Sequence, residues 1–426
     1  MKCINCGTDN TLKDRTGNQG RCKNCNHPFV FEPTQMTGFK ITDPMFAKFI
    51  ANISVNDTLF FTPKQLFYLL DNRFRKKSAP SAWGYFIFFF IASWIAISAT
   101  SSFIIPSLLA VFMIWFLFDA TTSSNTTLKT RRDNAKILQF VGVFILVVGI
   151  ILAIYPFNSF WAFASSVILG LLSIYLGFRQ ISLPQVGQTF LIDFNKFNEW
   201  LNRWQTINGS VNKILPAPRE ENLLSPSINP DVTAYSFDRL VVCGNSTIAQ
   251  LLIANNFHFE NNCAILSITG YPQNIFETTM EMLRRNPDLK VYAFHDCSPQ
   301  GMTLAHNLRT SANWFLDSNF TIIDVGLTPR QILSTQRGMF VQTSDESAQE
   351  AKLLAPEIRS ILSTEDLQWL DSGNFVELES FTPAKLIQIL RRGISSTNNL
   401  AVEDNSSILI FSDYNDTGVY AVESFG

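Results

Sequence analysis

Four long apolar runs without charged residues lie between positions 83 and 178, and they limit the folds open to the chain more than any other feature. A transmembrane helix needs about 20 consecutive apolar residues, and a helix that is apolar on all sides has no face to present to water. The first stretch is too long for one span, and Ser98–Ser102 and Pro106 interrupt it, so we expect a hairpin of two helices there. The sequence therefore predicts four transmembrane helices, at about 83–99, 103–118, 137–155 and 161–178.

Basic residues flank these runs unevenly. They precede the first run, lie between the second and third, and follow the fourth, whereas the connections Ser98–Ser102 and Pro156–Ser159 carry no charge. The basic residues are Arg73, Arg75, Lys76, Lys77, Lys129, Arg131, Arg132 and Arg179. Because basic loops stay on the cytoplasmic side, we expect both termini in the cytoplasm and the protein in the plasma (inner) membrane. The expected spans hold no ionisable side chain, which favours an anchor in the lipid bilayer, with homo-oligomerisation left open, over an ion pathway.

Four of the seven cysteines form two Cys-x-x-Cys pairs at the start of the chain, Cys3 with Cys6 and Cys22 with Cys25, separated by 15 residues. Each pair can place two thiolates on one ion, and a turn residue, glycine or asparagine, follows each pair. Residues 1–32 thus resemble the zinc-ribbon family. The resemblance implies one structural Zn²⁺ held by all four thiolates, because a four-cysteine site leaves no open position for water.

The other three cysteines, Cys243, Cys263 and Cys297, lie in separate apolar segments. The N-terminus lacks the apolar stretch of a cleavable signal peptide, so we expect no export. In a reducing compartment these three residues are expected to be free, buried thiols.

Residues 38–81 are expected to form soluble helices, with Thr62 as a helix cap and Pro63 at the first helical position. Residues 1–81 hold 12 Lys/Arg and 6 Asp/Glu, a surplus that suits an anionic membrane surface or nucleic acid equally well.

Residues 190–235 are expected to begin with an amphipathic helix and to end in a Pro-rich linker. The apolar stripe of the helix consists of Phe190, Phe194, Phe197, Leu201 and Trp204. Such a stripe either lies on the bilayer surface or packs on a neighbouring domain, and the sequence leaves both options open.

Residues 236–395 alternate short apolar runs with helical patterns, which is typical of an α/β domain with a mainly parallel sheet. One of the apolar runs ends at "HDCSPQG", where Ser298 and Pro299 have the residue types of a helix cap and a first helical position. The tail, residues 396–426, is expected to add a hairpin.

Four motifs of this region resemble, in order and spacing, the Toprim domain of the topoisomerase VI A subunit family. They are "GYPQNIFETTMEML", "VYAFHDCSPQGMTLAHNLR", "IIDVGLTPRQIL" and "LSTEDLQWLDSGNFVELESF". In that family, a Glu and an Asp-x-Asp pair bind Mg²⁺ for phosphodiester transfer. The resemblance places these acids at Cys243, Asp296 and Ser298, so two of the three are replaced. A thiol is a poor ligand for Mg²⁺, so the resemblance implies a degenerate active site and argues against a Mg²⁺ cofactor. The family's nucleophilic Tyr lies in a winged-helix domain, and this sequence offers no segment for one.

Three other interpretations of the same region stay open. Asp296 could share a Zn²⁺ site with His295, Cys297, Cys243 or His306. Alternatively, Asp324 could restore a second carboxylate for Mg²⁺, or the turn in "CGNSTIAQLL" could hold a nucleotide phosphate. Residues 236–395 hold 12 Lys/Arg and 17 Asp/Glu, an acidic balance that does not suit a track for a phosphate backbone.

The sequence thus predicts a multidomain chain with a Cys₄ zinc ribbon, a four-helix transmembrane bundle and an α/β Toprim-like domain. We expect a membrane-anchored, non-catalytic protein that recruits or senses a protein partner, with nucleic acid as a weaker candidate partner. The alternative is a membrane-tethered Mg²⁺-dependent nuclease or topoisomerase-like enzyme with a rearranged site.

Overall fold

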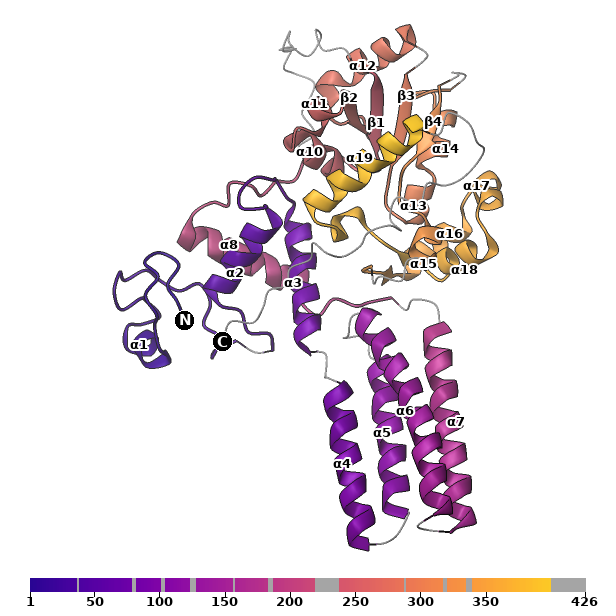
Figure 1. Cartoon of the computed structure of the whole chain (residues 1–426). Coiled ribbons are helices and arrows are strands. Elements are labelled where there is room, and N and C mark those ends of the chain that lie inside the picture. The colour runs from indigo at the N-terminus through magenta and orange to yellow at the C-terminus, as the bar shows by residue number, and fades with distance from the viewer. Residues whose placement is uncertain are drawn as a thin grey trace. The chain divides into compact units, whose positions relative to one another are not determined.

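The computed structural model describes residues 1–36, 38–78, 82–100, 104–122, 128–155, 158–182, 187–218, 237–286, 289–316, 320–334 and 339–399. The chain divides into two compact units (Figure 1). Unit 1 comprises Met1–Leu70, Ile192–Gln336 and Thr343–Gly426, and unit 2 comprises Asp71–Leu191 and Arg337–Gln342. Unit 1 is therefore built from segments on both sides of the apolar block.

The N-terminal part of unit 1 consists of short helices. These are α1 (Leu12–Gly17), α2 (Asp43–Ile53) and the first half of α3 (Pro63–Ser78). The predicted start of α3 is confirmed, because the Gln65 N–H donates to Thr62 Oγ1 at 3.2 Å and the Thr62 N–H donates to Gln65 Oε1 at 3.0 Å. This reciprocal pair satisfies two backbone donors at the helix end.

The predicted amphipathic helix is α8 (Phe194–Asn208), and it packs within unit 1. Phe197, Leu201 and Trp204 are buried, and the Phe197 ring lies 5.4 Å from the Phe67 ring of α3. The expectation that Phe190 belongs to this helix is wrong, because the chain is extended or bent until Asp193. Of the two options for the stripe, packing against protein is therefore the observed one. The Pro-rich linker falls mostly on residues 219–236, outside the described residues.

A four-stranded parallel sheet forms the centre of the α/β part of unit 1, with strand order β2-β1-β3-β4. Its strands are β1 (Arg239–Cys243), β2 (Cys263–Ser267), β3 (Lys290–Phe294) and β4 (Ile322–Asp324). The helices between them are α10 (Ser246–Ala254), α11 (Phe257–Glu260), α12 (Gln273–Arg285), α13 (Pro299–Met302) and α14 (Leu304–Thr310). The predicted alternation and parallel direction are confirmed, and α10 and α11 pack beside β2 (Figure 1).

Further elements follow β4, and they belong to unit 1 except for Gln342, the first residue of β5, which belongs to unit 2. They are α15 (Pro329–Ser334), β5 (Gln342–Thr343), α16 (Asp345–Lys352), α17 (Pro356–Ile361), α18 (Thr364–Asp371), β6 (Asn374–Phe375), a 3₁₀ turn η1 (Leu378–Ser380) and α19 (Pro383–Asn399). The segment before η1 pairs with the end of β3 through the antiparallel bridge Cys297↔Val376. Residues 396–399 continue α19, and the segment for which a hairpin is predicted lies within residues 400–426, outside the described part of the chain.

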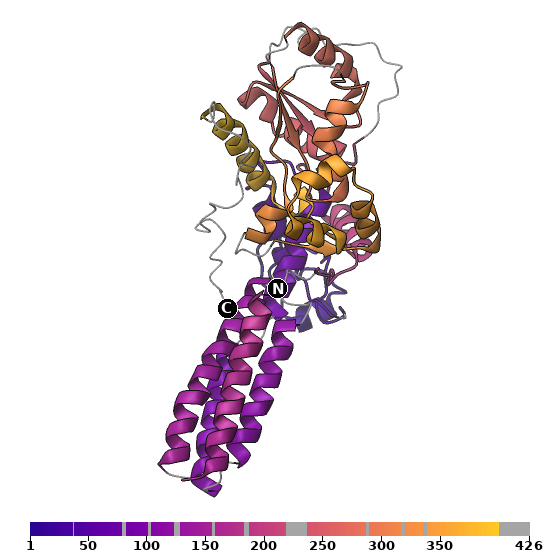
Figure 2. The same ribbon diagram turned by 90° about the vertical axis from the view of Figure 1, so that its right-hand side faces the viewer.

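Unit 2 contains helices α4 (Ala82–Thr100), α5 (Ile104–Thr122), α6 (Leu128–Ile154) and α7 (Phe160–Ser182), which lie side by side in Figures 1 and 2. In the described residues, three segments are long and apolar enough to cross a membrane: Ile104–Thr122, Arg131–Ile154 and Phe160–Ile181. α4 adds a shorter apolar segment, Phe86–Ile95. The protein therefore has the helices of a membrane protein.

The start of α6 differs from the expected span. We expected the helix from position 137, but it begins at Leu128, so Arg131 and Arg132 lie on the helix and not in a loop. Residues 128–136 contain Lys, Arg and Ala, which favour helix, and no Gly or Pro to stop it. The spans with the expected bounds hold no ionisable side chain, but the longer candidate spans take in Asp119, Arg131 and Arg179 near their ends.

Small residues allow α6 and α7 to approach closely. A Cβ atom at Gly170 would lie 2.4 Å from Leu146 Cγ, and one at Gly149 would lie 2.5 Å from Ser166 Oγ. Ser173 Oγ donates to the Leu138 carbonyl at 2.7 Å across the same interface. Close backbone contact and hydrogen bonds between helices are typical of association in lipid.

Candidate functional site

The four N-terminal cysteines come together as predicted. The Sγ atoms of Cys3, Cys6, Cys22 and Cys25 all lie within 4.8 Å of one another. The Cys3–Cys25 and Cys6–Cys22 Sγ distances are both 3.6 Å. Four sulfurs placed tetrahedrally about 2.3 Å from one ion would be about 3.8 Å apart. The cluster could therefore hold a metal ion with little movement.

Two similar turns position the four thiols. The Gly7 N–H donates to the Cys3 carbonyl at 2.9 Å, and the Asn26 N–H donates to the Cys22 carbonyl at 3.0 Å. Gly7 and Asn26 have positive φ angles, 72° and 58°, which explains the glycine and the asparagine at these positions. The spacing within each cysteine pair, with the turn residue that follows it, therefore determines each half of the site locally.

The surroundings of the thiols differ. Burial raises the pKa of Cys3 to about 12, whereas hydrogen bonds with Thr8 lower the pKa of Cys6 to about 5. A backbone hydrogen bond from Cys25 lowers the pKa of Cys22, and Asn10 Nδ2, which donates to Cys22 Sγ at 3.5 Å, adds to this effect. A bound cation would favour the thiolate at Cys3, where burial opposes it.

The end of β3 brings Asp296 into contact with a distant segment. The Leu378 N–H donates to Asp296 Oδ1. Burial raises the pKa of Asp296 to about 6, and the negative charges of Glu377 and Glu379 add to this effect. The carboxylate of Asp296 thus already serves as an acceptor that ties η1 to the end of the sheet.

Cys243 and Ser298, where the Toprim resemblance places two acids, have structural roles. Cys243 is fully buried at the end of β1, where burial raises the pKa of its thiol. Ser298 is the N-cap of α13, as predicted, and its Oγ accepts the Gly301 N–H at 3.0 Å. The thiol of Cys243 therefore offers no oxygen ligand beside Asp296, and the hydroxyl of Ser298 serves as a helix cap.

His295 forms a second contact network at the end of the sheet. Its Nδ1 lies 2.8 Å from the Asp296 carbonyl oxygen, and its Nε2 lies 3.0 Å from Asp324 Oδ1. Burial lowers the pKa of His295, but Asp324 and the carbonyl more than offset this, so the net shift is upward. Gly326 packs on the ring, because a Cβ there would lie 2.4 Å from His295 Cδ2. His295 thereby links the ends of β3 and β4.

Sequence reasoning missed the side chains that α3 places beside η1. Lys64 Nζ lies 2.7 Å from Glu377 Oε2, and Tyr68 Oη donates to the same oxygen at 2.6 Å. Thr62 Oγ1 donates to Glu379 Oε1 at 2.8 Å. The two acids occur in the motif "FVELESF", but no local pattern shows that residues some 300 positions earlier neutralise them.

The alternative metal sites are not assembled in the described residues. Within those residues, the only group of three or more His, Cys, Asp or Glu side chains close enough to share an ion is the four-cysteine cluster. His306 lies on α14, and Asp324 pairs with His295. For the nucleotide alternative, Asn245 Oδ1 already accepts the Ile248 N–H at the start of α10, at 2.8 Å.

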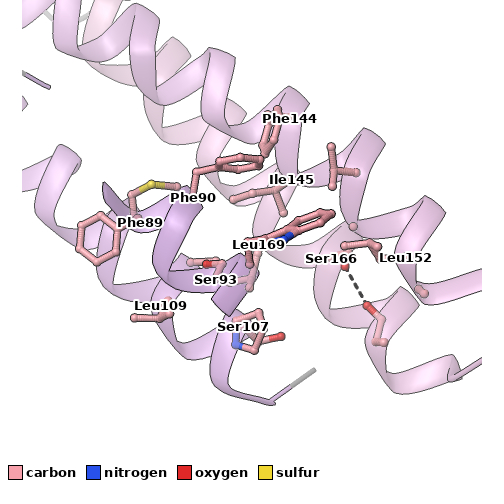
Figure 3. Close-up of a pocket in the computed structure, with 18 of the residues that line it drawn as sticks. Phe89, Phe90, Ser93, Ser107, Leu109, Phe144, Ile145, Leu152, Ser166 and Leu169 are labelled. Carbon is pink, nitrogen blue, oxygen red and sulfur yellow. Dashed lines mark hydrogen bonds between the residues drawn. The ribbon is translucent and has the colours of Figure 1, made fainter. Parts of the chain in front are cut away.

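Unit 2 contains a cavity of about 400 Å³ among its four helices (Figure 3). Its lining is aromatic and aliphatic apart from the hydroxyls of Ser93, Ser107 and Ser166. Ser166 Oγ donates to the Ala162 carbonyl at 2.8 Å, so that hydroxyl is already bonded. The lining residues include no titratable side chain, so the cavity suits hydrocarbon and not an ion.

Comparison with known proteins finds no match: no family model and no curated protein sequence matches the chain. The Toprim and zinc-ribbon resemblances therefore rest on the motifs quoted above. The function has to be inferred from the residues and their contacts.

Proposed function

We propose that this chain is a membrane-anchored, non-catalytic recruiting or sensing protein that carries a zinc ribbon and a degenerate Toprim-like domain on the cytoplasmic face of the plasma membrane. The observation that carries the proposal is the engagement of Asp296 by the Leu378 N–H. This hydrogen bond gives Oδ1 of the carboxylate a structural role, because it fastens two segments of unit 1.

The neighbouring positions support the same proposal. Mg²⁺ prefers oxygen ligands, and the buried thiol of Cys243 and the capping hydroxyl of Ser298 do not supply them. Glu377 and Glu379 are nearby acids, but Lys64, Tyr68 and Thr62 bind them. The fold is thereby retained as a scaffold for binding, and its partner is expected to be a protein.

Zinc is the proposed occupant of the four-cysteine cluster. Thiolates select soft or borderline ions, and Zn²⁺ is bound tetrahedrally by four cysteines in structural sites. Such a site leaves no coordination position for substrate. The ion would hold the two turns of residues 1–28 together and present the surface of the ribbon to a partner.

Unit 1 contains chain segments from both sides of the apolar block, which supports an even number of membrane crossings. Phe67 of α3 packs on Phe197 of α8, and Phe61 pairs with Ile214, so residues before and after the apolar block form one folded body. A chain that leaves and rejoins the same body must cross the bilayer an even number of times. With three candidate spans by length, α4 is the proposed fourth crossing.

Cysteine labelling tests this topology in intact cells. We expect a membrane-impermeant maleimide to label Ser102→Cys and Ser159→Cys from outside, because both short connections carry no charge and would face outward. Ser124→Cys, between α5 and α6, is the matched control and should react only after permeabilisation. Equal labelling of Ser124→Cys in intact cells would rule out four crossings with cytoplasmic termini.

Substitution of Asp296 tests its structural role. Its raised pKa means that the folded state binds the proton more tightly than the unfolded state, so stability falls as the pH rises from about 4 to about 6 and stays at the lower level above that. Asp296→Asn keeps the acceptor for Leu378 and removes this charge. We expect a gain of up to about 3 kcal/mol at pH 8, reduced by solvent screening, and almost no gain at pH 4. Thermal unfolding of the full chain in detergent at both pH values measures the difference.

Mg²⁺ dependence separates this proposal from the nuclease alternative. A ligand that binds the folded state raises the melting temperature with the logarithm of its concentration. We expect millimolar Mg²⁺ to leave the melting temperature of the natural chain unchanged. We also expect no metal-dependent nicking of supercoiled DNA. A Mg²⁺-dependent shift or nicking activity that Asp296→Asn abolishes would overturn the non-catalytic assignment.

Recruitment is tested directly by co-purification from mildly solubilised membranes, with bound proteins and nucleic acid both identified. We expect a defined protein partner to co-purify with the natural chain and to be reduced in Cys3→Ser, which disrupts the ribbon. Recovery of nucleic acid and no specific protein would contradict the proposed partner class.

A further inference from the structure

Two polar side chains near the start of α6 are buried and make no hydrogen bond at several donors. Arg131 is 8% exposed and Asn134 is 3% exposed. Nε and Nη2 of Arg131 and Nδ2 of Asn134 have no acceptor. Buried donors are nearly always paired, and an unpaired buried guanidinium is among the most destabilising groups in a protein. This set of donors therefore suits an anion.

The helix geometry brings these donors together. Residues three positions apart lie on the same face of a helix, so Arg131 and Asn134 are neighbours on α6. Both lie in the first two turns of a helix of 27 residues. The free N–H groups and the positive end of the helix dipole favour an anion at that end.

Arg75 and Asp71 do not satisfy Arg131. The positive charge of Arg75 acts on it, which increases the preference for an anion. Asp71 is already bound, because it accepts Nε of Arg75 at 2.6 Å and the Leu191 N–H at 2.7 Å. The carboxylate closest in sequence to Arg75 is thus occupied elsewhere.

The position of Arg131 along α6 identifies the kind of anion. The apolar candidate span begins at Arg131, so this residue lies where hydrocarbon gives way to headgroups. Basic pockets at this depth on the cytoplasmic side suit phosphate-containing headgroups. We propose that Arg131 and Asn134, with the first turns of α6, bind a phosphate group from a lipid headgroup or from free phosphate.

Arg75, whose charge acts on Arg131, contacts a segment that comes from the α/β part of the sequence. Residues 337–342 belong to unit 2, and the Arg75 guanidinium lies 5.1 Å from the centre of the Phe340 ring. A phosphate at Arg131 would therefore act on Arg75, which contacts the connection between α15 and α16. Binding of a lipid phosphate at Arg131 could thus affect the position of that connection. This effect does not depend on the role of Asp296.

Binding is tested on the full-length chain, purified in detergent and stripped of lipid. The probes are inorganic phosphate, short-chain phosphatidylglycerol, and the matching diacylglycerol, which lacks the phosphate. Melting temperature and native mass spectrometry report binding. Arg131→Gln removes the charge, and Lys136→Gln is the matched control because Lys136 is exposed on the same helix.

We expect phosphatidylglycerol to stabilise the natural chain and Lys136→Gln, and to bind Arg131→Gln roughly ten- to a hundredfold more weakly. Stabilisation by inorganic phosphate as well would identify free phosphate as a sufficient ligand, and stabilisation by the lipid alone would identify a headgroup. Equal effects of phosphatidylglycerol and diacylglycerol, or equal binding by Arg131→Gln and Lys136→Gln, would overturn the proposal. If Arg131→Gln does not fold, Asn134→Leu with the same probes must show the weaker binding.

Discussion

Cys22→Ser is expected to release the metal ion from the N-terminal ribbon and to unfold residues 1–28. Cys22 is fully buried at the centre of the cluster, 3.6 Å from Cys6. Structural zinc contributes about 10–16 kcal/mol in small zinc domains, and one of four thiolates carries roughly a quarter of that. We therefore expect affinity to fall by about 100- to 1,000-fold. Metal analysis should give one Zn²⁺ per natural chain and none after dialysis of the variant.

Cys263→Ser is the matched control for this loss. Cys263 is also a buried thiol, but it lies in β2 and belongs to the sheet. This variant should retain one Zn²⁺ per chain and a protease-resistant N-terminus. Stoichiometric zinc in both Cys3→Ser and Cys22→Ser would place the ligands elsewhere in the chain.

Gly326→Ala is expected to have the second large effect. The new methyl group would lie 2.4 Å from two atoms of the His295 ring, which is 1% exposed and has no room to retreat. Overpacking of this kind costs about 1–3 kcal/mol, and the loss of the His295–Asp324 contact would add to it. A lower melting temperature of the full chain would measure the effect.

Two control experiments test whether the clash with His295 causes the destabilisation by Gly326→Ala. Gly17→Ala should leave the melting temperature nearly unchanged, because a Cβ there meets no atom within 4 Å. In a His295→Ala background, Gly326→Ala should cost much less, since the clashing ring is gone. Additive effects of the two substitutions would show that His295 is not the group that Gly326 accommodates.

The parts of the fold that the sequence predicts well are those encoded locally. The four-cysteine cluster follows from spacing within 25 residues, and the Ser298 cap follows from the residue types at one turn. The parallel sheet follows from apolar runs that alternate with helical patterns. In each case, the residues that make the contact are close in sequence or share a simple period.

Long-range pairing is where sequence reasoning fails. Lys64 and Glu377 are 313 positions apart, and nothing in either segment indicates that they meet. The same holds for Asp296 and Leu378, whose contact gives that carboxylate a structural role. Phe190 was assigned to the α8 stripe because its spacing fits, although the helix begins only at Phe194. Periodicity identifies a face but not the residue at which a helix begins.

The order of synthesis has a consequence for how this protein matures. The first 70 residues are made before all the membrane helices, yet Glu377, the partner of Lys64, follows 313 positions later. At 5–20 residues per second, Lys64 waits roughly 15 to 60 s for Glu377 to be synthesised. The apolar side of α3 also waits, because Phe197 of α8, which packs on Phe67, is made only after α7. Truncated chains that end after α7 should therefore be inserted in the bilayer but remain targets for chaperones and proteases.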